Sequence, residues 1–427
     1  MTDSIERRVA TEVAAELHRA GHIAWFAGGC VRDRLLGAEP KDYDIATDAE
    51  PARVAELFPG SLRVGEAFGV MLVRRDGCST EVATFRRDGA YGDGRRPDEV
   101  SWSSPEEDAQ RRDFTINGLF ENPATGEVID HVGGQADLER GVIRAIGTAE
   151  DRIEEDRLRM LRAVRFAARL GFSLDDATGV AIRRRAAGLT SVSRERIGHE
   201  FRAMLAHPRR ADAVAQLANL RLLGPVFAGF GPVPGGPGPR LRRLAPGAPF
   251  SLALAAWLLD AASVDRDSGD DVVTQPGDFA EAEARIARAT DEADRRIDAW
   301  RDALVLSNAE VGAVIRAIES RAAVLAGGPP STMKPRLSGG GAGPALALLA
   351  AEHPAAGARA AATVRRLAAS GLDPAPLVTG EHLRAAGLTP GPGFGQWIAA
   401  VRVAQLDGYV RTSADALGLV LRWAAGD

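Results

Sequence analysis

Cysteine and long apolar runs are both scarce in this sequence. The two cysteines, Cys30 and Cys78, are too few for a disulfide framework, and neither has a Cys or His neighbour at zinc-ligand spacing. The longest apolar runs, such as FSLALAAWLL from Phe250, fall short of the ~20 residues of a membrane span. The stretch after Met1 lacks the basic start and apolar core of a signal peptide. We therefore expect no disulfide framework, no zinc site, no membrane role and a cytoplasmic location.

An excess of positive charge is also absent. The chain has 53 Lys and Arg against 58 Asp and Glu, a formal net charge of -5. This balance argues against a protein that coats nucleic acid by bulk charge, but it allows a local basic groove. At ~150 residues per domain, the 427 residues suggest about three domains.

Strand and helix patterns divide the chain into a mixed part and a helical part. The pattern predicts strands at 22–29 and 43–47 and a strand pair at 69–85, with helices from Val31 and Pro51 between them. This βαβαββ order predicts a small α+β head. Beyond about residue 145 helical patterns dominate, interrupted by Gly/Pro-rich segments at 227–240 and 327–344 that we expect to be exposed loops. The fold class is therefore α+β, a small mixed sheet with helices followed by an all-α remainder.

Two aspartates in the predicted strand YDIAT and its approach form a candidate metal site. Asp42 and Asp44 flank Tyr43, so both side chains point to the same face of a strand. Glu81, in a later strand of the same sheet, is a candidate third ligand. Hard oxygen ligands suit Mg²⁺, and two ions ~3.5 to 4 Å apart would activate an attacking oxygen and neutralise a leaving one. A solvated Asp-x-Asp at a strand end is the alternative.

Two further groups are candidates for phosphate and ribose binding. Gly28 and Gly29 let backbone amides approach a phosphate at a helix start, and Arg32 adds a guanidinium fork. A plain strand-to-helix turn with a surface arginine is the alternative. Downstream, a cluster able to hold a triphosphate or ribose, or else to serve as an ion-paired structural segment, comprises Arg111, Arg112, Asp113 and Asn117.

The segment Glu154–Phe172 is predicted as one helix with polar residues three apart: Asp156, Arg159, Arg162 and Arg165. A solvated face of ion pairs is one interpretation. The other follows from donor and acceptor accounting, because an Asp accepts and an Arg donates. Together they match the base edge of cytosine or adenine, an amino donor beside a ring-nitrogen acceptor, and reject uracil and guanine. One protein site could therefore select CTP and ATP without a template.

These motifs, in this order, resemble the class II tRNA nucleotidyltransferases, the CCA-adding enzymes, with the related bacterial poly(A) polymerases. GGCVRD with KDYDIAT is similar to the first motif of the family and RRDFTING to the second. The hinge, the base-selecting helix and the neck motif are matched by DHVGGQADLERGVIRAIG, EDRLRMLRAVRFAARLGF and SRERIGHEFRAML. The segment 376–408 also resembles the tail of bacterial members. The chain departs from the family pattern at Gly118, where alanine is usual, and at Arg157, where proline is usual.

The resemblance implies a particular organisation and set of roles. It implies a catalytic head over 1–145, a neck with the base-selecting helix over 146–210, a body over 211–370 and a tRNA-binding tail over 371–427. Asp42 and Asp44 would hold two Mg²⁺ ions, and the nucleotide would be contacted by Gly28, Gly29, Arg32, Arg111 or Arg112, and the polar residues of the selecting helix. The tRNA acceptor and T arms would lie along the helical part.

The predicted function is template-independent addition of CCA to tRNA 3′ ends from CTP and ATP. Segment 85–114 resembles the complete flexible loop of members that add A, which disfavours CC-only activity. Addition of A alone, poly(A) synthesis, an inactive RNA-binding protein and a small-molecule nucleotidyltransferase remain as alternatives. The oligomeric state is not predicted.

Overall fold

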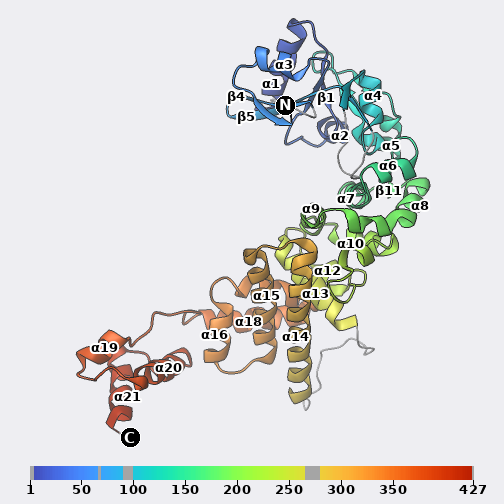
Figure 1. The fold of residues 1–427 in the computed structure, drawn as a ribbon. Helices are drawn as coiled ribbons and strands as arrows, with labels where there is room; N and C mark the ends of the chain where they lie inside the picture. The colour runs from blue at the N-terminus through green and yellow to red at the C-terminus, as the bar shows by residue number, and fades with distance from the viewer. Residues whose placement is uncertain (1–3, 66–68, 90–99, 265–278, 426–427) are drawn as a thin grey trace. The chain divides into compact units, whose positions relative to one another are not determined.

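The computed structural model describes residues 4–65, 69–89, 100–264 and 279–425 (Figure 1). The chain divides into two compact units. The first comprises residues 1–204 and 215–228, and the second comprises residues 205–214 and 229–427. The division into head, neck, body and tail stays a prediction. Among the described residues, no helix is long and apolar enough to cross a membrane.

The first unit contains a seven-stranded sheet in the order β3-β4-β5-β2-β1-β8-β9. The strands are β1 (Ala24–Ala27), β2 (Ile45–Thr47), β3 (Leu62–Gly65), β4 (Val70–Arg75), β5 (Cys78–Thr84), β8 (Leu119–Glu121) and β9 (Val128–Asp130). Only β2 and β5 pair in parallel; the other neighbours are antiparallel. The predicted mixed sheet is confirmed, but the βαβαββ order omitted β3, β8 and β9.

The elements of this sheet that the sequence predicted correctly have short turn or helix-start motifs beside them. The β4–β5 hairpin turns at Asp76 and Gly77, which both have positive φ, 50° and 78°. Helix α3 (Pro51–Leu57) has proline in its first turn, where no backbone N–H is needed. Both were predicted. By contrast β3, β8 and β9 span only three or four residues each, too few to give a clear alternation of polar and apolar residues.

One face of helix α1 (Ile5–Arg19) supplies much of the core beneath the sheet. Val9, Val13 and Leu17 recur every four residues and are completely buried. Helix α1 contacts β1 and β5, and Ser4 caps its N-terminus by accepting a hydrogen bond from Arg7 N. Burial of each of these larger side chains stabilises the fold by about 1.5–3 kcal/mol. The sheet therefore presents its loops from a fixed support.

The predicted helix over Glu154–Phe172 is wrong in one respect, because it is broken. Helix α6 (Ala149–Glu155) ends before Asp156, and α7 (Arg159–Leu170) begins three residues later. Asp156 is extended, with φ -143° and ψ 101°, and its Oδ1 accepts a hydrogen bond from Leu158 N at 3.1 Å. This side-chain bond offers the backbone an alternative to the helical ladder, which explains the break.

Further helices complete the first unit: α2 (Gly29–Leu35), α4 (Pro105–Gln110), α5 (Gly134–Arg140), α8 (Asp176–Arg185), α9 (Arg194–Leu205) and α11 (Leu223–Phe227). Two small sheets accompany them, β6 (Arg86–Asp88) with β7 (Val100–Trp102) and β10 (Val142–Ile143) with β11 (Ser173–Leu174). Part of the predicted flexible loop, residues 90–99, lies outside the described residues.

The second unit is helical throughout its described residues. Its helices are α12 (Pro239–Arg243), α13 (Phe250–Val264), α14 (Phe279–Leu304), α15 (Asn308–Ala326), α16 (Pro330–Leu337), α17 (Ala342–Glu352), α18 (Pro354–Ala368), α19 (Gly380–Ala385), α20 (Pro392–Leu406) and α21 (Ser413–Ala425); α10 (Arg210–Asn219) is shared between the units. Trp257 and Trp300 meet edge to face in the core, 4.8 Å between ring centroids.

One expectation about loops in this unit is wrong. The Gly/Pro-rich segment 327–344 contains helix α16, which forms because buried Met333 and Leu337 anchor one of its faces. The basic run at 239–244 forms helix α12. Its Arg240 pairs with Glu352 at 2.6 Å and with buried Asp260 at 3.2 Å. Tertiary contacts overrode the local composition in α16.

Candidate active site

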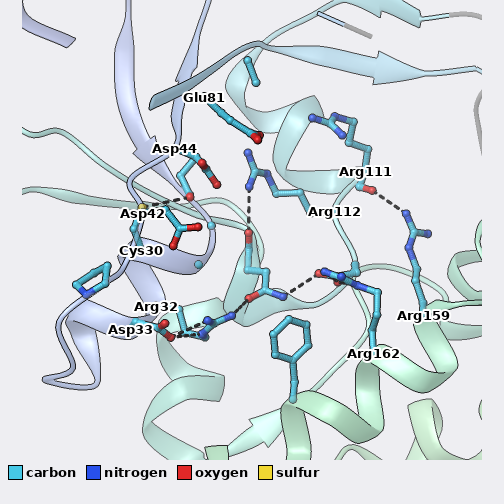
Figure 2. Close-up of a pocket in the computed structure, with 18 of the residues that line it drawn as sticks. Cys30, Arg32, Asp33, Asp42, Asp44, Glu81, Arg111, Arg112, Arg159 and Arg162 are labelled. Atoms are coloured by element: carbon cyan, nitrogen blue, oxygen red, sulfur yellow. Dashed lines mark hydrogen bonds and ion pairs between the residues drawn. The ribbon is translucent and has the colours of Figure 1, made fainter. Parts of the chain in front are cut away.

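A cavity of about 740 Å³ lies in the first unit and contains every site residue that the sequence predicted (Figure 2). The predicted residues that line it are Gly28, Gly29, Arg32, Asp42, Asp44, Glu81, Arg111, Arg112, Asp113, Asn117, Asp156, Arg159, Arg162 and Arg165. They come from the β1–α2 turn, the segment before β2, strand β5, the segment after α4, and the α6–α7 region. Residues separated by more than a hundred positions thus meet in one place.

Asp42 and Asp44 lie on the approach to strand β2, not within it, because β2 begins at Ile45. The alternation nevertheless holds: Tyr43 is buried, and both aspartates line the cavity. A hydrogen bond from Ala27 N to Asp44 O, 2.9 Å long, fixes this approach against β1. Figure 2 shows the Glu81 carboxylate on the side of Asp44, whose pKa it helps to raise. The two side chains therefore share one face, as their spacing predicted, and their role in binding a metal stays a prediction.

The charge of these carboxylates is poorly compensated. Burial, followed by Glu81 and Asp42, raises the pKa of Asp44 to about 6, and Arg112 only partly opposes this. Within the described residues, no hydrogen bond or ion pair joins the Asp42 or Asp44 carboxylate to another side chain. No three His, Cys, Asp or Glu groups in the described part of the chain form a complete metal cage. An acidic pair without a counter-ion fits a hard cation that takes its remaining ligands from a substrate phosphate and water.

The glycine turn and Arg32 form the neighbouring wall. Gly28 has φ 73°, and a Cβ there would lie 2.9 Å from Arg112 Nη1. Arg32 is buried and donates to Asp33 Oδ1 and to Asn117 Oδ1, while its guanidinium carbon lies 5.1 Å from the ring centroid of Phe166. The positive φ therefore favours glycine at this turn, and Arg32 is held rigidly rather than exposed at the surface.

Asp113 and Asn117 connect Arg32 to Arg162. Asp113 Oδ1 accepts from Asn117 Nδ2 at 2.9 Å and from Phe114 N at 2.8 Å, and its Oδ2 accepts from Arg162 Nε at 2.8 Å. Burial would raise the pKa of Asp113, but Arg162 and Asn117 outweigh it and hold the pKa at about 2. This segment is ion-paired, as one of the two alternatives predicted, and it also lines the cavity.

Arg111 and Arg112 share one buried partner, Asp108. Arg111 Nη2 lies 2.7 Å from Asp108 Oδ1, and Arg112 Nη2 lies 3.0 Å from Oδ2. The carboxylate is 1% exposed, so it is an internal support and not a ligand for substrate. It directs two guanidinium groups toward the cavity.

Asp156 and Arg159 occupy the junction of α6 and α7. Arg159 Nη1 donates to Glu155 Oε2 at 2.6 Å and to Arg152 O at 2.7 Å, and its Nη2 donates to Arg111 O at 3.2 Å. Because Arg159 opens α7 while Asp156 lies in the break before it, the two are not on one continuous helix face. They still line the same cavity.

Sequence reasoning missed several lining residues, among them Asp33, Phe166 and Arg169. Asp33 Oδ2 accepts from Arg169 Nη2 at 2.8 Å. The Phe166 ring lies 5.3 Å from the Arg162 guanidinium carbon and 4.5 Å from that of Arg165. Arg169 follows Arg165 at a spacing of four, the spacing that places side chains on one helix face, so continuing the arginine stripe by one step would have found it.

Two family models each match a part of this chain. The poly A polymerase head domain matches residues 24–144, and the probable RNA and SrmB-binding site of polymerase A matches residues 171–232. Over these segments the chain is therefore similar to a family that includes the CCA-adding enzymes, as the motifs indicated.

Two curated relatives show how far the sequence similarity extends. The chain is 45% identical over 201 residues to the CCA-adding enzyme of Lactiplantibacillus plantarum, covering 47% of this chain and 49% of the relative. It is also 45% identical over 207 residues to that of Bacillus subtilis, covering 48% and 52%. The matched region thus spans about half the length of these curated relatives.

Similarity to solved structures covers nearly the whole chain, whereas the sequence similarity to these curated relatives covers about half of it. The CCA-adding enzyme of Bacillus stearothermophilus in complex with CTP is 29% identical, with a TM-score of 0.70 over 99% of this chain and 100% of that one. The Thermotoga maritima CCA-adding enzyme complexed with tRNA is 20% identical, with a TM-score of 0.65 over 98% of this chain and 95% of that one, and so supports the fold.

Proposed function

We propose that this protein is a template-independent RNA nucleotidyltransferase that adds CCA to tRNA 3′ ends from CTP and ATP. The observation that carries the proposal is the presence, in one cavity, of an uncompensated carboxylate pair and an acceptor-donor pair, Asp156 and Arg159. The relatives named above support it, since they are CCA-adding enzymes. An RNA-binding protein without catalysis has no need for the carboxylate pair.

Asp42 and Asp44, with Glu81 beside them, would hold two Mg²⁺ ions. When bound, these ions supply charge stabilisation at the reacting phosphate. The tRNA 3′-hydroxyl attacks the α-phosphate of CTP or ATP, the bond to the β-phosphate breaks, and pyrophosphate leaves. Arg32, Arg111 or Arg112 holds the triphosphate, with Gly28 and Gly29 allowing its close approach. Asp113 and Asn117 keep Arg32 and Arg162 in place.

Base selection would depend on Asp156 and Arg159. Asp156 accepts from the exocyclic amino group of cytosine or adenine, and Arg159 donates to the adjacent ring nitrogen. Uracil and guanine present the opposite pattern and leave both groups unpaired, which a buried polar site penalises strongly. Arg162 and Arg165 extend the nucleotide-binding wall along α7.

The remaining parts of the proposal concern the partners and the helical half. The tRNA acceptor and T arms would contact the neck, body and tail over 146–210, 211–370 and 371–427, and the protein would act in the cytoplasm. These boundaries divide the chain more finely than its two compact units do.

The test is incorporation by the purified chain with Mg²⁺ and labelled CTP or ATP on three tRNA transcripts, ending before CCA, after C and after CC. We expect two cytidines and one adenosine to complete the first transcript, followed by arrest. Adenosine on the CC transcript alone would mean that a partner supplies the cytidines. A long adenosine tract would mean a poly(A) polymerase, and tRNA binding without incorporation an inactive RNA-binding protein. Transfer to a low-molecular-weight acceptor would identify a small-molecule enzyme.

Asp42→Ala serves as the metal-site variant in the same assay. It should reduce incorporation to background while tRNA binding stays near that of the unmodified chain, because the carboxylate acts in the chemistry rather than in RNA docking. Undiminished incorporation by Asp42→Ala would remove the metal assignment while leaving the family relationship intact.

A further inference from the structure

The base-reading carboxylate lies outside any helix, so something other than helical backbone must hold it. Asp156 occupies the break between α6 and α7 in an extended conformation. Its Oδ1 accepts from Leu158 N at 3.1 Å, and its Oδ2 accepts from Arg196 Nη2 at 2.7 Å. Both oxygens are therefore fixed, one locally and one by a distant residue. A carboxylate has about four acceptor sites, so capacity remains for a base amino group.

Arg196 approaches Asp156 from outside the cavity. It belongs to α9, forty residues further along the chain, and is not among the described side chains that line the cavity. Both side chains are largely shielded from solvent, with 24% of Arg196 and 16% of Asp156 exposed. A charge-assisted bond in such surroundings holds its partner more firmly than an exposed pair does. Arg196 is thus placed to orient Asp156 without touching the nucleotide.

A competing partner makes this orientation necessary. The pKa of Arg162 is raised chiefly by Asp113, and Glu200 and then the Asp156 carboxylate add to that effect, so Arg162 is near enough to attract Asp156. Without Arg196, the Asp156 side chain would be free to turn toward Arg162. It would then no longer present an acceptor to the base edge.

We propose that Arg196 is a positioning residue for nucleotide selection, which holds Asp156 so that only bases with an amino donor pair with it. This inference rests on the proposed function. Arg159 is held by Glu155, four residues before it on adjoining helical segments, whereas Asp156 depends on α9. The neck motif therefore contributes to the choice of CTP and ATP, in addition to any structural role.

The experiment measures kcat and KM for CTP and UTP with the full-length chain and a tRNA transcript lacking CCA. Arg196→Ala should lower the ratio of the two kcat/KM values by about 10- to 100-fold, mostly through weaker use of CTP, because small misplacements of a reading group have effects of this size. Arg196→Lys should restore part of the ratio, since lysine keeps the charge but not the planar fork.

Two further variants act as references. Arg185→Ala removes a nearby arginine that pairs with Glu154 at 3.5 Å, two residues from Asp156, and should keep the original ratio. Asp156→Ala removes the reading group itself and should lower the ratio at least as far as Arg196→Ala does. Circular dichroism and thermal unfolding establish that each variant is folded. Should Arg196→Ala not fold, Arg196→Gln takes its place.

The outcomes separate this inference from the proposed function. A chain that incorporates neither nucleotide, or an Asp156→Ala variant with an unchanged ratio, contradicts the proposed reaction or its reading group. Suppose that the unmodified chain incorporates CTP and that Asp156→Ala lowers the ratio, as proposed. If a folded Arg196→Ala variant then loses CTP and UTP activity equally, the role of Arg196 is structural and the inference is overturned. An equal loss of selectivity in Arg185→Ala would overturn it too, because the effect would not depend on the partner of Asp156.

Discussion

Asp44 is the residue at which the requirements of the proposed chemistry and of stability diverge. Its pKa of about 6, against an ordinary 3.8, means that the folded metal-free chain holds this proton more tightly than the unfolded chain does. Stability therefore falls as the pH rises from 3.8 through 6, and the full penalty is present above about 6. A bound cation would remove that penalty. The folded protein is therefore less stable without the metal than with it.

Asp44→Asn should accordingly raise the stability of the metal-free protein above pH 6, although it would abolish the proposed activity. The gain should shrink as the pH falls from 6 toward 3.8, where the native carboxyl group becomes neutral. Urea unfolding of both proteins in excess chelator, at several pH values, measures the difference. Because Asn is nearly the same size as Asp, a difference that does not change with pH would point to packing and contradict the electrostatic explanation.

At the level of single residues, the sequence predicted positions that depend only on neighbouring residues. It missed contacts between residues that are far apart in the sequence. Asp42 and Asp44 could be assigned to one face because residues two apart in an extended segment share a face whatever the rest of the fold does. The contact of Arg196 with Asp156 joins positions 40 residues apart. No local period encodes such pairs, so only the folded chain brings them together.

Among the secondary-structure elements, the break between α6 and α7 matters most for the site. The periodicity of apolar residues predicted one helix, because Met160, Leu161 and Val164 continue a helical pattern. Such a pattern does not reveal an interruption of three residues. The break places Asp156 at the cavity with its side chain facing α9. A continuous helix would have left the Asp156 backbone hydrogen-bonded within the ladder and its side chain without the Leu158 contact.

The break makes a clear prediction about proline. Asp156 is already extended, the conformation that proline favours in the residue before it, so Arg157→Pro should fold and change the free energy of unfolding by only about 1 kcal/mol. It gives up the pairing of Arg157 with Glu154 and a 2.8 Å bond to Ser191 Oγ, both near the surface. Ala163→Pro, in the buried interior of α7, should instead cost about 3 kcal/mol or more.

Thermal and urea unfolding of the two proline variants, compared with the unmodified chain, test the position of the break. Base selection by Arg157→Pro should also stay close to the original, since the Asp156 contacts with Leu158 N and Arg196 survive the change. Equal destabilisation by both variants would mean that the helix is continuous through Asp156, as the sequence pattern alone suggested.

Across the whole molecule, the proposed chemistry belongs to one compact unit, whereas most of the proposed body and all of the proposed tail belong to the other. Every residue lining the active-site cavity lies in the unit formed by residues 1–204 and 215–228. The other unit has its own core, built around Trp257 and Trp300, and its own buried charge network joining Arg240, Asp260 and Glu352. The nucleotide should therefore stabilise one unit by mass action and leave the second unaffected.

Differential scanning calorimetry of the full chain provides the test. CTP with Mg²⁺ at 100 times its dissociation constant should stabilise the first unit by about 2.7 kcal/mol and shift its transition alone. Asp260→Asn is the matched variant for the second unit, because Asp260 is buried and accepts from Arg240 Nη1 and Leu241 N. It should lower the other transition, by about 1–3 kcal/mol in free energy, and leave the response to CTP unchanged. If CTP shifted both transitions equally, the units would unfold as one, and nucleotide binding would be transmitted to the helical half of the chain.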